Sequence, residues 1–296
     1  MKIAKLGRII VLGMVVGLLD VGQALAEPVS LPATVPVGNA DNPGDRTGFG
    51  SVPYKYRIAK HEVTMEQYAA FLNAAVKQRT AGYLSQMSRY GLVRVANGTE
   101  KDFVAKAGWE KKPAVLASWN DAVRFANWLT NGMGDGSTEN GAYKFIDEWG
   151  EKTLKMPDHA ALAAGSKVHW VLASENEWYK AAYYDPAKNG GAGGYWQYPA
   201  PGGNPPKANL GTTTMMDVGS FPESKSAYGT LDQGGNVWEW NETKAGGHCG
   251  VRGGSFWHND GVHYMASGTR YCTNPPEFVY DNYGFRVVAL GGKASK

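Results

Sequence analysis

Two histidines near the C-terminal end of the sequence have the chemistry of metal ligands. His258 and His263 stand five positions apart in the run HNDGVH, with Asp260 between them as the nearest third ligand. Imidazole nitrogen binds copper, zinc or iron well. Two imidazoles are too few for a stable site. We therefore keep two interpretations, a transition-metal site at His258 and His263 or a pair of ordinary loop histidines.

Motifs for several other chemistries are absent from the sequence. It contains no GxxxxGK[S/T] loop for a nucleoside triphosphate, no GxSxG serine-hydrolase turn, no CxxC pair and no HExxH zinc helix. The two cysteines, Cys249 and Cys272, lie 23 positions apart. An oxidising compartment allows them to pair, but spacing alone does not show that their geometry permits a disulfide.

The charge balance excludes partners that are bound mainly by electrostatics. The chain of 296 residues has 30 basic and 27 acidic side chains, a formal net charge of +3. Three of those basic residues and one acidic residue fall in the first 26 positions, so the remainder carries only +1. Nothing in this balance indicates nucleic acid or an anionic membrane surface as partner.

The N-terminus has the three regions of an export signal. Basic residues precede an apolar run from Ile9 to Leu19, and Ala24-Leu25-Ala26 forms a small-residue cleavage site. The apolar run is about half of the roughly 20 residues that a membrane-spanning helix needs, and no later segment is apolar enough. We expect a signal peptide over 1–26, cleaved after Ala26, and a periplasmic or secreted protein with no membrane span.

Three capping patterns predict the helices that must position any site. Helices are expected to begin after Thr64, Ser118 and Ser174, each followed three residues later by Gln, Asp or Glu and then by apolar residues at helical spacing. Short strands are expected at 56–58, 168–172, 237–240, 251–256 and 285–288. Residues 27–50 have turn formers and no periodicity, so we interpret them as an extended lead-in. With 39 glycines, the rest predicts one irregular α+β domain over 51–292.

Six strings in a fixed order resemble the formylglycine-generating enzyme, or sulfatase-modifying factor, family. They are IAKHEVT from Ile58, PAVLASW from Pro113, LASENEW from Leu172, GNVWEW from Gly235, RGGSF from Arg252 and GFR from Gly284. The resemblance spans about 230 residues. It implies a compact, loop-rich variant of the C-type-lectin-like fold, which agrees with the expectation from composition and caps.

The resemblance also implies an activity that this sequence departs from. The family oxidises a sulfatase cysteine to formylglycine with O2, using Cu(I) held by two cysteines in a C-x4-C spacing after the Gly-Gly-Ser string. Counted without gaps, those positions are His258 and His263 here, so both catalytic cysteines are absent. Cys249 and Cys272 lie outside the motif and do not replace them.

A calcium site is a second implication of the resemblance. The family's Gly-Asn-x-Trp-Glu-Trp string supplies oxygen ligands that correspond to the Asn236 side chain, the Val237 carbonyl and the Glu239 side chain. Hard oxygen donors suit Ca²⁺. The alternative is an ordinary carboxylate on a strand.

Several residues match the family's active-site cleft. Ser255 matches a serine that lines it, Arg270 matches an arginine that binds substrate peptide, and Trp257 and Tyr264 flank the same segment. Together with His258 and His263, these residues form our candidate cleft, and the alternative is that they only complete the core. Arg286 is expected to be a buried structural arginine, with substrate contact as its alternative.

Three function classes follow from these patterns. The favoured hypothesis is an exported binding module for a peptide, glycan or protein ligand, without formylglycine-generating activity. The alternative is a metal-dependent oxidoreductase of the same family, using copper or another transition metal at His258 and His263 or generating formylglycine on a sulfatase peptide. A structural envelope component is the third. Whether the chain is an enzyme stays open, with the missing cysteines favouring a non-enzyme.

Overall fold

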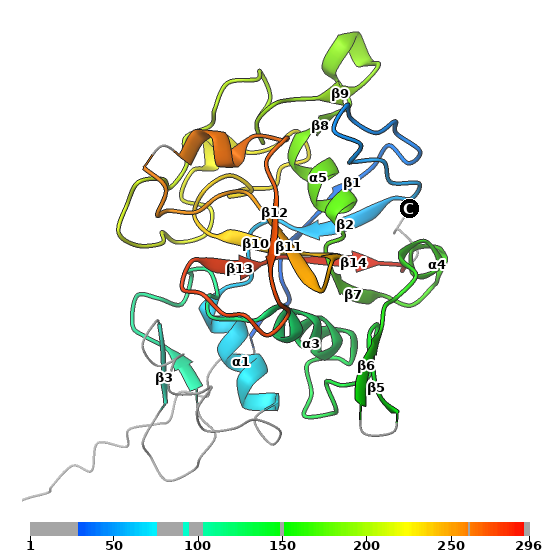
Figure 1. Cartoon of the computed structure of the whole chain (residues 1–296), viewed down its shortest axis with the longest axis vertical. Coiled ribbons are helices and arrows are strands. Elements are labelled where there is room, and N and C mark those ends of the chain that lie inside the picture. The colour runs from blue at the N-terminus through cyan, green and yellow to red at the C-terminus, as the bar shows by residue number, and fades with distance from the viewer. Residues whose placement is uncertain (1–28, 76–90, 95–102, 149–150, 260, 293–296) are drawn as a thin grey trace, which may run out of the picture.

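The computed structural model describes residues 29–75, 91–94, 103–148, 151–259 and 261–292 (Figure 1). The expected signal peptide over 1–26 and the candidate ligand Asp260 lie outside these residues. None of the helices in the described part is long and apolar enough to cross a membrane.

A four-stranded antiparallel sheet ties the two ends of the domain together. Its order is β1 (Thr34–Val37), β2 (Tyr56–Ala59), β14 (Val287–Leu290) and β7 (His169–Leu172). All four residues of β14 are buried, as expected for an apolar run in the middle of a sheet. The segment interpreted as a lead-in therefore contributes the edge strand β1 to this sheet.

A second four-stranded sheet contains the tryptophan-rich string. Its order is β12 (Tyr271–Asn274), β11 (His248–Arg252), β10 (Trp238–Ala245) and β13 (Tyr283–Phe285). The β10–β13 pair is parallel and the other pairs are antiparallel. The first four residues of β10 are buried and the last two exposed.

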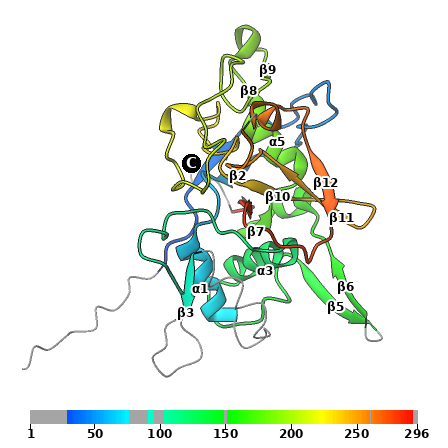
Figure 2. The ribbon, with the colours of Figure 1, turned by 60° about the vertical axis from the view of Figure 1, so that its left-hand side comes forward.

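The three helices expected from their caps are confirmed as α1 (Met65–Ala75), α3 (Trp119–Thr130) and α5 (Glu175–Tyr183). Reciprocal capping boxes form at Ser118 and Ser174. Figure 1 and Figure 2 place α1 and α3 on one side of β14 and β7, and α5 on the other. The short helix α4 (His159–Ala164), capped by Asp158, was not predicted.

Strands form at all five expected places, but their bounds differ: the strand expected over 237–240 is β10, which continues to Ala245, and the strand expected to begin at 251 is β11, which begins at His248. The strand expected over 251–256 ends at Arg252, because Gly253 and Gly254 have positive φ values of 102° and 79°. The strand expected over 285–288 is divided between β13 and β14 at Arg286, whose side chain is fully buried.

Short elements complete the described fold. They are the hairpins β3 (Leu92–Arg94) with β4 (Phe103–Ala105), β5 (Lys144–Glu148) with β6 (Glu151–Lys155) and β8 (Tyr184–Asp185) with β9 (Gly194–Tyr195), and the 3-10 turns η2 (Lys188–Gly191), η3 (Pro222–Ser224) and η4 (Gly261–Met265). The β5–β6 hairpin extends away from the body of the fold (Figure 2). Mixed helices and short strands confirm the α+β expectation.

Candidate functional site

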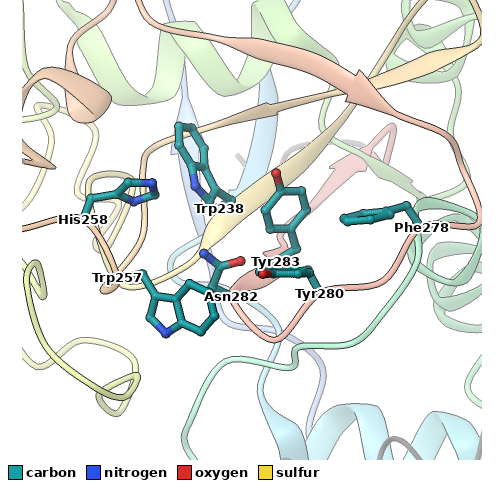
Figure 3. Close-up of a pocket in the computed structure, with 7 residues that line it drawn as sticks. All are labelled: Trp238, Trp257, His258, Phe278, Tyr280, Asn282 and Tyr283. Atoms are coloured by element: carbon teal, nitrogen blue, oxygen red, sulfur yellow. The ribbon is translucent and has the colours of Figure 1, made fainter.

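An aromatic pocket of about 250 Å³ opens beside β10 and β13 (Figure 3). Three segments supply its walls: β10, the turn after Gly253-Gly254, and the chain that leads into β13. Its aromatic wall residues are Trp238, Trp257, Phe278, Tyr280 and Tyr283. His258 and Asn282 are the polar lining residues, and the lining of the described pocket includes no carboxylate, lysine or arginine.

A glycine turn brings the middle segment to this pocket. A Cβ atom at Gly254 would lie 2.9 Å from the Cβ of Tyr264, and the positive φ of Gly254 also disfavours any other residue. The turn ends β11 and carries Trp257 and His258 to the pocket wall. The Gly-Gly string is therefore needed for the backbone path that builds the site.

The polar side of the pocket is a short hydrogen-bonded row. Asn282 donates from Nδ2 to Ser255 Oγ at 2.8 Å, and Ser255 Oγ lies 3.1 Å from His258 Nδ1. Ser255 is fully buried, so it holds its two neighbours and does not line the pocket. Asn282 is only 4% exposed, and its Oδ1 has no hydrogen-bond partner among the described residues. A buried acceptor without a donor is costly, and among the residues that line the pocket Asn282 is the one with such an atom.

The pocket rim presents large exposed rings. Trp257 is 47% exposed and Tyr280 41% exposed. Their rings meet edge to face with ring centres 5.6 Å apart. The Tyr280 ring is also nearly parallel to the Phe278 ring, with ring centres 5.8 Å apart. Trp238, by contrast, is buried and forms the inner wall, where His258 meets it edge on at 5.6 Å.

The structure brings together only part of the predicted cleft. Ser255, Trp257 and His258 converge at the pocket, and Tyr264 packs behind His258 with ring centres 4.1 Å apart. His263 does not line the pocket. Its ring packs against Tyr264 as well, with ring centres 3.8 Å apart.

Arg270 does not reach the pocket. Its guanidinium lies 2.7 Å from a Glu175 carboxylate oxygen, and the buried Arg252 pairs with the same carboxylate at 2.7 Å. The ring of Phe49, from the lead-in, lies 5.1 Å from the Arg270 guanidinium. In this arrangement Arg270 fastens α5 and the lead-in to the second sheet.

The transition-metal hypothesis stays a prediction. In the described residues no group of three or more His, Cys, Asp or Glu side chains is arranged to hold a metal ion. Both imidazoles contact Tyr264, and Asp260, the expected third ligand, lies outside the described part.

The proposed calcium ligands are engaged with protein groups. Glu239 is fully buried and accepts from Arg286 Nε and Nη2, each at 2.6 Å, and from Trp178 Nε1 at 2.6 Å. The Asn236 amide accepts from Met216 N at 3.0 Å and donates to Glu62. This arrangement does not fit a calcium ion, because both Glu239 oxygens already face donors. Calcium at Asn236, Val237 and Glu239 stays a prediction that requires Glu239 to leave Arg286.

The expectation of a buried structural arginine at Arg286 is confirmed. Besides Glu239, it donates to the carbonyls of Ala59, Lys60 and Leu231 at 2.9–3.3 Å. The nearby acid Glu62 is buried, and its burial together with the charges of Asp232 and Glu239 holds its pKa well above the usual value. The Arg286 guanidinium is thus the positive charge shared by three acids, Glu239, Glu62 and Asp232.

A second buried network escaped sequence analysis. His159 Nδ1 lies 3.0 Å from Glu177, and Nε2 lies 3.1 Å from Glu242, which also accepts from Tyr143 at 2.6 Å. Burial alone lowers the pKa of His159, but the two carboxylates raise it to about 11. Sequence analysis also missed the pocket residues Phe278, Tyr280, Asn282 and Tyr283. The three aromatic residues within these six positions were a signal for them, whereas Asn282 had none.

The two cysteines are both free thiols on the neighbouring strands β11 and β12. Cys272 Sγ donates to the His248 carbonyl at 3.1 Å. Burial raises the pKa of Cys249 to about 12, so this thiol is inert at neutral pH.

Comparisons with known proteins agree with this fold. The family model described as the sulfatase-modifying factor enzyme 1-like domain matches residues 34–290. A curated relative, inactive C-alpha-formylglycine-generating enzyme 2 of Mus musculus, is 35% identical over 104 residues, which cover 33% of this chain and 33% of that protein. The match thus spans a third of the relative's length.

Two solved structures share the fold. Treponema denticola variable protein 1 is 19% identical with a TM-score of 0.54, covering 86% of this chain and 94% of that chain. CarF is 22% identical with a TM-score of 0.54, covering 88% and 98%. At such identities the likeness concerns the fold alone, the C-type-lectin-like α+β fold. Because the family model matches nearly the whole described fold, the chain belongs to the sulfatase-modifying factor, or formylglycine-generating enzyme, family.

Proposed function

We propose that this protein is a binding module that uses the aromatic pocket to hold a peptide, glycan or protein ligand, without generating formylglycine. The observation that carries the proposal is the pocket itself, with exposed aromatic walls and a buried amide oxygen that awaits a donor. Concave, mostly apolar sites with a few placed polar groups are the general form of ligand sites.

The chemistry of the same segment supports the absence of formylglycine generation. Cu(I) is held by soft thiolates, and the matching positions here carry His258 and His263. Of the two cysteines, Cys249 is a buried thiol with a raised pKa, and the Cys272 thiol donates a hydrogen bond to a backbone carbonyl. The curated mouse relative is itself named an inactive enzyme, which agrees with this proposal.

The test has two arms. The purified mature protein is screened on glycan and peptide arrays beside Trp257→Ala, which removes an exposed pocket wall with little effect on folding. We expect a ligand whose binding is lost in Trp257→Ala. In the second arm, a Cys-x-Pro-x-Arg peptide is incubated with the protein, copper and O2, and its mass is followed. Conversion of the cysteine to formylglycine would overturn the proposal.

The second candidate function is a metal-dependent oxidoreductase. It is favoured by one observation, that His258 and His263 both lie against Tyr264 within one short segment. Metal analysis of the protein, repeated on His258→Ala with His263→Ala, tests it. Stoichiometric copper, zinc or iron that disappears in the double variant would support this function, and its absence in the wild type would dismiss it.

We also propose export to the periplasm or the exterior of the cell. The support is the three-part pattern in residues 1–26. N-terminal sequencing of the protein isolated from its host should begin at Glu27, whereas a retained Met1 would contradict cleavage.

A further inference from the structure

We propose that the aromatic pocket binds one neutral pyranose ring of a saccharide. This deepens the proposed function by naming the class of ligand, and it rests on that function. Four features of the pocket carry the inference: its size, its ring surfaces, its unsatisfied acceptor and its uncharged lining.

The size fits one small ring. The pocket holds about 250 Å³, just below the ~300–1,000 Å³ typical of sites for drug-sized ligands. A single sugar ring is compact and rigid, so it loses little conformational freedom on entering such a space. The rim is open at Trp257 and Tyr280, which leaves room for further sugar units of a chain to continue outward.

The ring surfaces fit the apolar faces of a pyranose. A sugar ring presents C–H groups on its faces and hydroxyl groups around its edge. Trp257 and Tyr280 meet at an interplanar angle of 83°, so they offer two surfaces at nearly a right angle. One ring can stack on a sugar face while the other closes its edge. Exposed aromatic rings that adjoin one another, as these do, are a typical feature of a ligand-binding surface.

The acceptor fits a hydroxyl group. Because Asn282 Nδ2 is used by Ser255, the amide is oriented with Oδ1 as its unpaired atom. Oδ1 is buried, so a hydroxyl donor reaches it only when the Asn282 side chain turns toward the pocket; the hydroxyl would then satisfy this oxygen and would itself keep an acceptor for a neighbouring group. A ligand without a donor would leave Oδ1 unpaired, as it is in the free protein, and would gain no hydrogen bond there.

The charge of the lining favours a neutral ligand. No carboxylate, lysine or arginine lines the pocket in the part of the chain that the structure describes. A charged ligand would lose its hydration there without gaining a counter-charge. The guanidinium that could have bound an anion, Arg270, is held by Glu175.

The test is titration calorimetry of the mature protein with four probes, the methyl α-glycosides of glucose, galactose, mannose and N-acetylglucosamine. We expect at least one to bind, and its affinity to fall at least tenfold in Trp257→Ala and in Asn282→Leu. Leucine is close to asparagine in size but offers no hydrogen bond. Trp196→Ala is the matched control, since it removes a tryptophan that does not line the pocket, and it should leave the affinity unchanged.

Thermal unfolding of each variant checks folding, and Trp257→Ala stands alone if Asn282→Leu fails to fold. Absence of glycoside binding, or binding that survives Trp257→Ala, would overturn the saccharide proposal. N-acetyl-tyrosinamide serves as the peptide probe in the same titration. If it binds in a Trp257-dependent manner and the glycosides do not, the saccharide proposal fails and the binding-module function stands. If neither probe nor any array ligand depends on Trp257, both fail.

Discussion

The ion pair between Glu239 and Arg286 should be one of the most sensitive points for stability. Both side chains are fully buried, and two hydrogen bonds of 2.6 Å join them. Removing one member of a buried pair leaves an uncompensated charge and costs about 3–5 kcal/mol. At roughly 2–4 °C per kcal/mol for domains of this size, Tm should fall by roughly 6–20 °C.

The two single variants should differ in a defined order. In Glu239→Gln, Arg286 still lies near two further acids, Glu62 and Asp232. These acids can lose a proton and supply a negative charge that partly compensates the guanidinium. Arg286→Met instead leaves three acids without a cation and should cost more. The double variant should be less destabilised than the sum of the singles, by up to about 3 kcal/mol, because the missing interaction is counted twice in that sum.

The assay is urea denaturation and thermal unfolding followed by circular dichroism. Glu223→Gln is the control, since its pair with Lys207 is solvent-exposed at 3.6 Å and should change stability by less than ~0.5 kcal/mol. A cost below ~1 kcal/mol for Glu239→Gln, or a smaller cost for Arg286→Met, would refute the reasoning. Adding EDTA tests calcium at the same carboxylate: a fall in Tm that added Ca²⁺ reverses, and that is absent in Glu239→Gln, would support a calcium site at Glu239.

Three further predictions use other buried or constrained positions. The pKa of Glu62 is raised in the fold, so the free energy of unfolding of the wild type falls as the pH rises above about 4.3, the pKa of Glu in the unfolded chain. In urea denaturation, Glu62→Gln should therefore be more stable than the wild type at pH 8 and equal to it near pH 4. His159 has its pKa raised to about 11, so its contribution is full below pH ~6.5 and is lost toward pH 11. His159→Gln should therefore be less stable than wild type at pH 6, with a smaller gap at pH 10, and an equal gap would contradict the assignment. Gly254→Ala should lose more than about 1 kcal/mol in thermal unfolding, because its φ is 79° and Tyr264 fills the space; wild-type stability would contradict the turn geometry.

Much of the local structure could be predicted from the sequence. The caps at Thr64, Ser118 and Ser174 were enough to place the beginnings of three helices, because a cap satisfies backbone donors within three residues of itself. The ordered strings were enough to indicate the family. Gly253 and Gly254 indicated in the sequence that β11 ends before them, but the strand that we expected over 251–256 ran through both glycines.

The tertiary structure alone decided which side chains meet. The pocket joins Trp238, Trp257 and residues 278–283, which neighbour one another only because β13 pairs in parallel with β10. Arg270 forms an ion pair with Glu175, which lies 95 positions away in the sequence, and it does not reach the cleft that its match to the family suggested.

The sequence therefore determined three of the α-helices, the family and the loss of the cysteine pair, all of which depend on residue identity or on contacts within a few positions. The binding surface and the partners of Glu239 and His159 depend on packing between distant segments. For such contacts the free energy comes from burial and from paired charges, and neither exists until the sheets have formed.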